Sequence, residues 1–141
     1  MQSPVVWFPE LIRCGLTDAT PVLPADFSPE EAARLAYQHH VSGVVYTALS
    51  RAGLGLQSPV MRDLLAHTGR AVSVCETQTL ELDTLLAAFS ARGVDFLPLK
   101  GVTLRPLYPE PSMREMGDGD ILIRTEQYPT VAAIMEECGY V

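Results

Sequence analysis

The sequence has almost no lysine and too little positive charge for a nucleic-acid-coating protein. Lys100 is the only lysine among 10 basic residues, and the other nine are arginines. Seventeen acidic residues bring the net charge to -7. A protein that coats nucleic acid needs a basic face, so the charge argues against that class. A nucleotide substrate stays open, because metal ions and a few local cations can neutralise phosphates.

Cysteines and long apolar runs are also scarce. Cys14, Cys75 and Cys138 lie far apart, no pair has zinc-ligand spacing, and an odd number does not suggest a disulfide framework. We therefore expect a reducing, cytoplasmic setting. The first 15 residues lack a basic n-region, and no window approaches about 18 consecutive apolar residues. We expect neither a signal peptide nor a membrane-spanning segment.

The remaining composition is that of a globular protein, and its first part has a helical pattern. With 141 residues, of which 48% are hydrophobic and 19% charged, the chain can bury one core. We expect residues 1–27 to be irregular, with a short helix near 9–14. Ser28 and Pro29 then mark a helix start, and Gly53 to Gly55 mark the end of this region, with a break near Ser42-Gly43.

A second, longer helix is expected from Ser58-Pro59 to the stop at Gly93, roughly 30 residues. Such an amphipathic helix is expected to pack against another helix. Its predicted apolar stripe consists of Leu64, Leu65, Val72, Cys75, Leu82, Leu85, Leu86 and Phe89.

The pattern changes after Gly93. We expect a strand over 94–99, a short helix over 102–108 that Pro106 kinks or shortens, and a polar loop over 109–117. A second strand over 120–123 and a helix over 125–138 follow, and Tyr140-Val141 looks like the start of a third strand. The predicted fold is therefore α+β, with a helical region over 1–93 and a β-α-β-α unit with a small mixed sheet over 94–141. A strand that begins at Tyr140 suggests a chain cut short.

Two aspartates precede the second strand. Asp118 and Asp120 are two residues apart, so in extended backbone their side chains share one face, about 6–7 Å apart at Cα. Two carboxylates so placed can hold Mg²⁺, which prefers oxygen ligands and leaves positions for water and phosphate. The alternative is that Gly117 to Asp120 form a simple turn, because Asp-Gly is a strong turn signal.

The first strand ends at Lys100-Gly101, ahead of the short helix. Glycine lets backbone amides approach a phosphate, and the lysine adds a point charge. An isolated Lys-Gly could equally be a strand end at the surface. The two signals together favour a phosphate-facing loop beside a metal site.

In order, spacing and apolar context, these residues resemble the uncharacterised nucleotidyltransferase family of the polymerase-beta-like superfamily. The motif match covers about residues 97–141, and the preceding helices resemble that family's helical region less specifically. The matching segments are Leu99-Lys100-Gly101, Leu107-Tyr108-Pro109, Arg114, Met116-Gly117-Asp118, Asp120-Ile121-Leu122-Ile123, and Glu136 with Gly139-Tyr140.

The resemblance implies a metal-dependent transfer from a nucleoside triphosphate. Asp118 and Asp120 would be the catalytic metal ligands for Mg²⁺ or Mn²⁺, and Lys100 and Gly101 would lie near the triphosphate. Arg114 would touch phosphate; alternatively it braces the loop or pairs with a neighbouring glutamate. On this resemblance, residues 94–141 are the N-terminal part of a nucleotidyltransferase-like core.

Two features depart from the family pattern. Gly119 stands between the aspartates where a bulky apolar residue is usual, and glycine loosens a strand. The third carboxylate that such enzymes take from a later strand is not in this chain.

Two functions stay open. The first is an enzyme that transfers a nucleoside monophosphate to a hydroxyl, with a protein or small molecule favoured over long nucleic acid as acceptor. The second is a non-catalytic fragment that binds a partner or forms a homodimer through its sheet edge. His39, His40 and His67 are expected to be ordinary surface or core residues rather than metal ligands.

Overall fold

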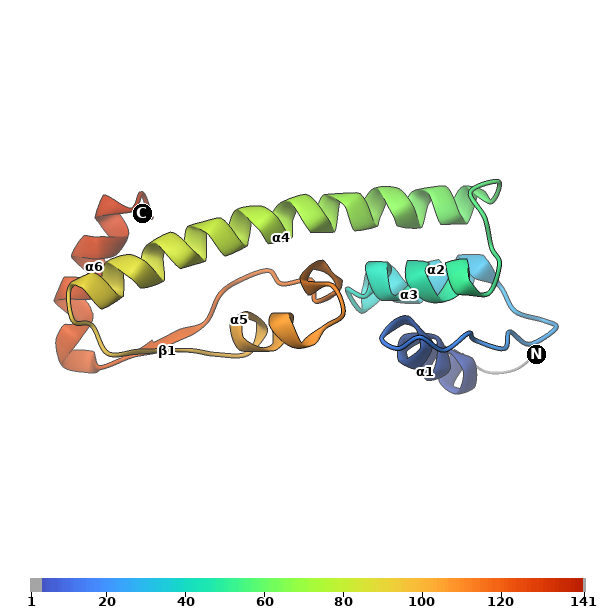
Figure 1. Ribbon diagram of the computed structural model, residues 1–141, viewed down its shortest axis with the longest axis horizontal. Coiled ribbons are helices and arrows are strands. Elements are labelled where there is room, and N and C mark those ends of the chain that lie inside the picture. Colours follow the sequence, from blue (N-terminus) through green and yellow to red (C-terminus); the bar gives the residue numbers. More distant parts are fainter. Residues whose placement is uncertain (1–3, 141) are drawn as a thin grey trace.

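A computed structural model describes residues 4–140 of the chain, and it is elongated along one long helix (Figure 1). Three N-terminal helices lie beside the first part of this helix, and the strands and short helices lie beside the rest. The elements are α1 Pro4–Gly15, α2 Pro29–Gln38, α3 Ser42–Arg51, α4 Pro59–Ala91, β1 Phe96–Pro98, α5 Gly101–Leu104, η1 Arg105–Leu107, η2 Pro111–Met113, β2 Ile121–Ile123, η3 Thr125–Gln127 and α6 Tyr128–Glu137.

The first helix is longer than the sequence suggested. We expected an irregular segment with a short helix near 9–14, but α1 runs from Pro4 to Gly15 and contains Pro9. Trp7, Leu11 and Cys14 recur at helical spacing and are buried, and the Trp7 ring meets Phe27 edge-on at 5.1 Å. Burial of this apolar face against α3 offsets the backbone hydrogen bond that Pro9 cannot donate.

The predicted helix start at Ser28 is confirmed, and the region divides close to the expected break. The Ser28 hydroxyl accepts a hydrogen bond from the Glu31 amide at 3.1 Å, and Pro29 is the first helical residue. The chain leaves α2 at His39 and turns through His40, whose φ of 55° lies in the left-handed region. Ser42 then begins α3.

The long helix α4 connects two separate hydrophobic clusters. Near its start, Met61 and Leu64 pack with α1, α2 and α3; near its end, Leu85 and Phe89 pack with both strands and α6. The predicted helix–helix packing is confirmed, since α4 contacts α3 and α6. The predicted stripe was wrong at two positions, because Leu65 and Val72 are exposed.

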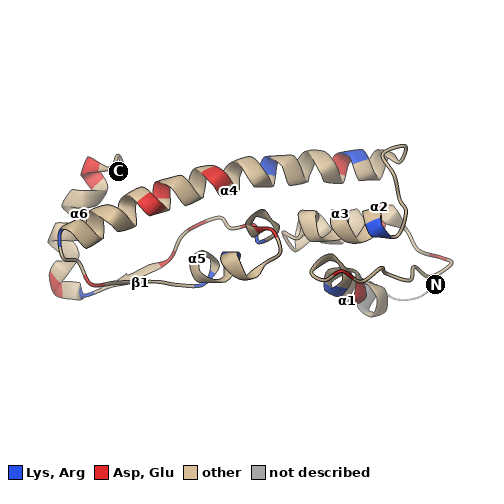
Figure 2. Ribbon diagram, in the orientation of Figure 1, with Lys and Arg blue, Asp and Glu red and all other residues tan. Residues whose placement is uncertain are grey.

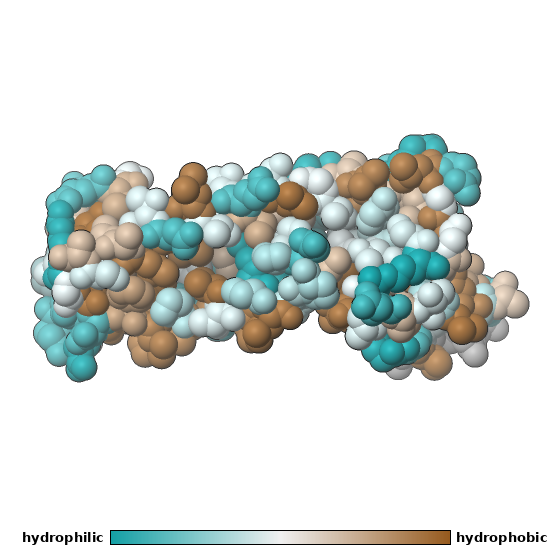
Figure 3. Space-filling view, viewed as in Figure 1, coloured by the Kyte–Doolittle hydropathy of each residue, from teal (hydrophilic) through white to brown (hydrophobic). Residues whose placement is uncertain are grey.

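The sheet of residues 4–140 has two antiparallel strands, with Phe96 opposite Ile123 and Leu97 opposite Leu122. Phe96 and Ile123 pack onto the cluster at the end of α4. The central pair points the other way and is exposed, Leu97 by 55% and Leu122 by 58%. Figure 3 shows hydrophobic surface along the side of the molecule that carries β1 and α5.

The chain between and after the strands follows the predicted order with shorter elements. Pro106 shortens the helix that follows β1: α5 ends at Leu104, and one 3-10 turn, η1, follows it. Gly139, with φ of 85°, ends the last helical segment as expected. Tyr140 is not in a strand: its amide donates to the Met135 carbonyl at 2.8 Å. Val141 lies outside the described residues.

The α+β class with N-terminal helices is confirmed. Among residues 4–140, no helix combines the length and apolar character needed to cross a bilayer.

Candidate functional site

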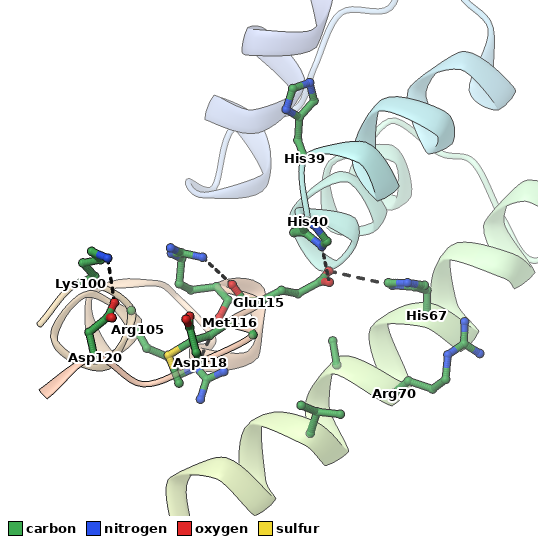
Figure 4. Close-up of a pocket in the computed structure, with 15 residues that line it drawn as sticks. His39, His40, His67, Arg70, Lys100, Arg105, Glu115, Met116, Asp118 and Asp120 are labelled. Carbon is green, nitrogen blue, oxygen red and sulfur yellow. Dashed lines mark hydrogen bonds and ion pairs between the residues drawn. The ribbon is translucent and has the colours of Figure 1, made fainter. Parts of the chain in front are cut away.

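Lys100 leaves β1 in an unusual backbone conformation and is paired with an aspartate of the second strand segment. Its φ is 46°, in the left-handed region that non-glycine residues rarely adopt. The neighbouring Leu99 amide donates to the Asp120 carbonyl at 2.9 Å, which brings the two segments together. Lys100 Nζ then lies 2.9 Å from Asp120 Oδ2 (Figure 4). The hydrogen bond and charge of Asp120 raise the pKa of Lys100 above its usual value.

Gly101 provides the space for the loop that carries the aspartates. A Cβ atom at this position would lie 2.5 Å from the Met116 sulfur and 2.9 Å from its Cγ. The Met116 side chain therefore rests directly on Gly101, and any larger residue would displace it. The steric role of Gly101 brings residues 115–118 beside the start of α5.

A buried arginine holds the same loop against α4, and no sequence pattern indicated it. Arg105 is only 6% exposed, and it donates to the Gln78 side-chain oxygen at 2.8 Å and to the Arg114 carbonyl at 3.3 Å. The Gln78 amide donates in turn to the Met116 carbonyl at 3.0 Å. Every hydrogen bond of this group crosses between elements, so it positions the loop rather than a ligand.

Asp118 and Asp120 lie just ahead of β2, which begins at Ile121 and not at Asp120 as expected. Asp118 is exposed and Asp120 is half-buried, and both line one pocket. Gly119 between them faces α4: a Cβ there would meet Leu82 at 3.3 Å. A larger residue at this position would require the Leu82 side chain to shift by a few tenths of an ångström.

The aspartate pair fits a divalent ion only together with a ligand. Mg²⁺ is commonly held by one or two carboxylates plus the phosphates of a substrate, and it keeps several waters. Two carboxylates in an open pocket match that pattern. Across residues 4–140 no group of three His, Cys, Asp or Glu side chains is placed to hold a metal, so these residues alone do not make a protein cage.

Arg114 also lines this pocket, but its visible contact is local. Its guanidinium donates to the backbone carbonyl of Glu115, the next residue. The described residues show no ion pair between Arg114 and a neighbouring glutamate carboxylate. This contact braces the loop and leaves the proposed phosphate role as a prediction.

A second group of polar side chains lies at the other end of the pocket, where we expected ordinary histidines. The Glu115 carboxylate, only 14% exposed, accepts from the Ser42 amide at 3.3 Å. It also lies 3.8 Å from His40 Nδ1 and 3.9 Å from His67 Nδ1 (Figure 4). These contacts join the turn before α3, the first third of α4 and the aspartate loop. The adjacent His39-His40 pair was the only sequence signal, and it did not indicate Glu115.

Both ends share one open pocket of about 570 Å³, within the range of small-molecule sites. Its lining is rich in nitrogen-bearing side chains for an acidic protein: all three histidines and four of the 10 Lys and Arg residues line it. Figure 2 shows how far the other charges are spread along the molecule. The four basic residues are Arg70, Lys100, Arg105 and Arg114.

A family model described as an uncharacterised nucleotidyltransferase matches residues 25–141. The chain belongs to this nucleotidyltransferase family. The match includes α2, α3 and α4 as well as the strands, so the turn that carries His40 and the helix that carries His67 and Arg70 lie within the family region. Comparison with curated proteins and with solved structures found no match. Membership of this nucleotidyltransferase family supports a nucleotidyltransferase-like function for the chain.

Proposed function

We propose that this chain binds a nucleoside triphosphate with Mg²⁺ or Mn²⁺ and supports transfer of the nucleoside monophosphate to a hydroxyl group. The observation that carries the proposal is the placement of Lys100, Asp118 and Asp120 on one pocket within the family match. Gly101 and Arg114 line the same pocket and complete the loop that faces the phosphates.

The proposed transfer is a nucleophilic displacement at the α-phosphorus. The acceptor oxygen forms a bond to the α-phosphorus, and the bond from that phosphorus to the bridging oxygen breaks. Pyrophosphate leaves with the electron pair, and the hydroxyl proton passes to water. Positioning and electrostatic stabilisation supply most of the catalysis in such reactions.

Each site residue has a separate task in this proposal. A divalent ion, when bound, supplies Lewis-acid neutralisation of phosphate oxygens, and Asp118 and Asp120 are the residues that would hold it. Lys100 adds a positive charge on the phosphate side, while its ion pair with Asp120 keeps both side chains in the pocket before the ligand arrives. Arg105 and Gln78 hold the loop in place from behind.

The test is a calorimetric titration of the chain with ATP and GTP, with and without Mg²⁺ or Mn²⁺. We expect binding that depends on the metal and that the double variant Asp118→Asn/Asp120→Asn loses. The matched control is Asp63→Asn/Asp83→Asn, which removes two charges from exposed positions of α4 outside the pocket. Binding that survives in the first variant, or is lost equally in both, would contradict the metal site.

A second candidate function has its own observation. The exposed cross-strand pair Leu97 and Leu122 gives the two-stranded sheet an uncovered apolar face. Exposed apolar surface of this kind marks contact sites, and a small sheet gains stability when it is covered. The alternative is a non-catalytic module that forms a homodimer through this face.

A further inference from the structure

Arg70 is the one basic side chain in residues 4–140 without a hydrogen-bond or ion-pair partner. It lies on α4, is exposed, and lines the site pocket. The other nine basic residues all have partners: Arg13, Arg34, Arg51, Arg92, Lys100 and Arg124 pair with carboxylates, and Arg62, Arg105 and Arg114 donate to backbone or amide oxygens. In a chain of net charge -7, an exposed arginine at the wall of a pocket, with no carboxylate bound to it, is available to an anionic ligand.

The neighbours of Arg70 leave its guanidinium free to take that ligand. His67 lies three residues earlier, about one turn along α4; in Figure 4 its ring points toward Glu115, whereas the Arg70 guanidinium extends away from Glu115. Ala71 and Val74 continue the pocket lining with short apolar side chains that offer it no partner. Glu115, a carboxylate of the pocket wall, faces His40 and His67.

Arg70 and Lys100 occupy different ends of the pocket. In Figure 4, Lys100 and Asp120 lie on one side, and His67 and Arg70 lie on the other, with Glu115 between the two groups. An in-line displacement places the leaving group and the attacking oxygen on opposite sides of the phosphorus. If the triphosphate lies toward Lys100, the acceptor therefore enters from the side of Arg70.

We propose that Arg70 binds an anionic group, a carboxylate or a phosphate, on the acceptor molecule. A guanidinium binds either group through two parallel hydrogen bonds, and this geometry fixes both the position and the orientation of the acceptor. The identification of the anion as part of the acceptor rests on the proposed function above. The substrate class that follows is a small or protein-borne hydroxyl compound that carries its own negative charge.

The experiment follows the three histidine side chains by NMR while inorganic phosphate or acetate is added at constant pH and ionic strength. The whole chain is used, and each histidine is assigned by its own substitution. We expect saturable shifts of His67 and His40, with one of the two anions binding more tightly, which separates a phosphate from a carboxylate acceptor. Arg70→Gln should weaken this binding about tenfold or more, while Arg70→Lys should retain part of it.

Arg34→Gln is the matched control, because Arg34 is an exposed helical arginine outside the pocket. It should leave the anion titration unchanged. Arg70 has no partner to lose, so Arg70→Gln should fold normally, and it should still bind ATP with Mg²⁺. A saturating, non-hydrolysable ATP analogue with Mg²⁺ should leave the anion shifts in place.

Several results would overturn the proposal. The proposal fails if the chain does not bind the anion, or if Arg70→Gln binds it as tightly as the native chain. It also fails if the ATP analogue displaces the anion, a result that would place Arg70 in the triphosphate site. Loss of nucleotide binding in Arg70→Gln would likewise place Arg70 in the triphosphate site. If the native chain binds the anion through Arg70 but binds no nucleotide, the proposed function fails first, and the acceptor assignment falls with it.

Discussion

Lys100 Nζ lies 2.9 Å from Asp120 Oδ2, so the only lysine of the chain is held against the second aspartate of the site. The same contact connects the end of β1 with the segment that leads into β2, next to the backbone bond from Leu99 to Asp120. The pair therefore keeps a cation and a carboxylate together in an otherwise open pocket. A bound triphosphate and metal would each compete for one partner.

This ion pair predicts how Lys100 titrates. The pKa of Lys100 is raised chiefly by the hydrogen bond that Lys100 donates to Asp120, whereas the charge of Asp118 has the smallest effect. Asp120→Asn should therefore lower the pKa of Lys100 toward its usual value, and Asp118→Asn should lower it much less. The pH titration of the single lysine Cε resonance measures both. Equal shifts in the two variants would contradict the assigned pairing.

The same shift predicts the sign of a pH effect on stability. A raised pKa in the folded state means that folding favours protonated Lys100, so this contribution is present at neutral pH. It is lost as the pH rises through the folded-state pKa. Because the Lys100 side chain is largely exposed and Asp120 is only half-buried, the effect should be small. Urea unfolding of the native chain and of Lys100→Gln should show a difference at neutral pH that disappears at strongly alkaline pH.

Gly101→Ala tests the contact between α5 and the aspartate loop. The new methyl group would meet the Met116 sulfur and Cγ, so the Met116 side chain must change its rotamer, and we expect a loss of about 1 kcal/mol in the free energy of unfolding. We also expect weaker nucleotide binding, because Met116 lies in the loop that carries Asp118. Gly117→Ala is the control, since a Cβ there has no atom within 4 Å. Equal stability of the two variants in urea denaturation would refute the steric role.

Gln78→Ala tests the link between α4 and the same loop. It leaves buried Arg105 without one acceptor and the Met116 carbonyl without its donor, so we expect a loss of about 1–3 kcal/mol in unfolding free energy. Urea denaturation measures it, and Glu76→Ala, at an exposed position of the same helix, should change little. A loss no larger than that of the control would mean that the buried network does not stabilise the loop.

Replacing the exposed leucines of the sheet tests the homodimer alternative. Threonine is β-branched and common in strands, so Leu97→Thr/Leu122→Thr should preserve the sheet while removing its apolar face. If the face joins two copies, sedimentation should show a concentration-dependent dimer in the native chain and a monomer in the variant. The exposed pair Leu56 and Leu80, changed to glutamine, is the control. A native chain that stays monomeric would remove this candidate.

Local sequence signals gave most of the helix and strand boundaries. Ser28 and Pro29 specify a helix start through a side-chain cap and a fixed φ. Pro106 ends α5 because proline has no backbone N–H to donate, whatever surrounds it. The order and spacing of Lys100, Asp118 and Asp120 also gave the family, which the match over residues 25–141 confirms. These features depend on neighbouring residues only, so the linear sequence is enough to specify them.

Other features were decided by contacts between distant parts of the chain. The N-terminal segment became a full helix because Trp7 and Leu11 could be buried against α3, a gain that no local propensity contains. The Arg105–Gln78 bond spans 27 residues, and the Ser42–Glu115 bond spans 73. Arg70 stands out only because every other basic side chain in residues 4–140 found a partner. Such a distinction exists only after folding, since it depends on which carboxylates and carbonyls come within hydrogen-bond distance.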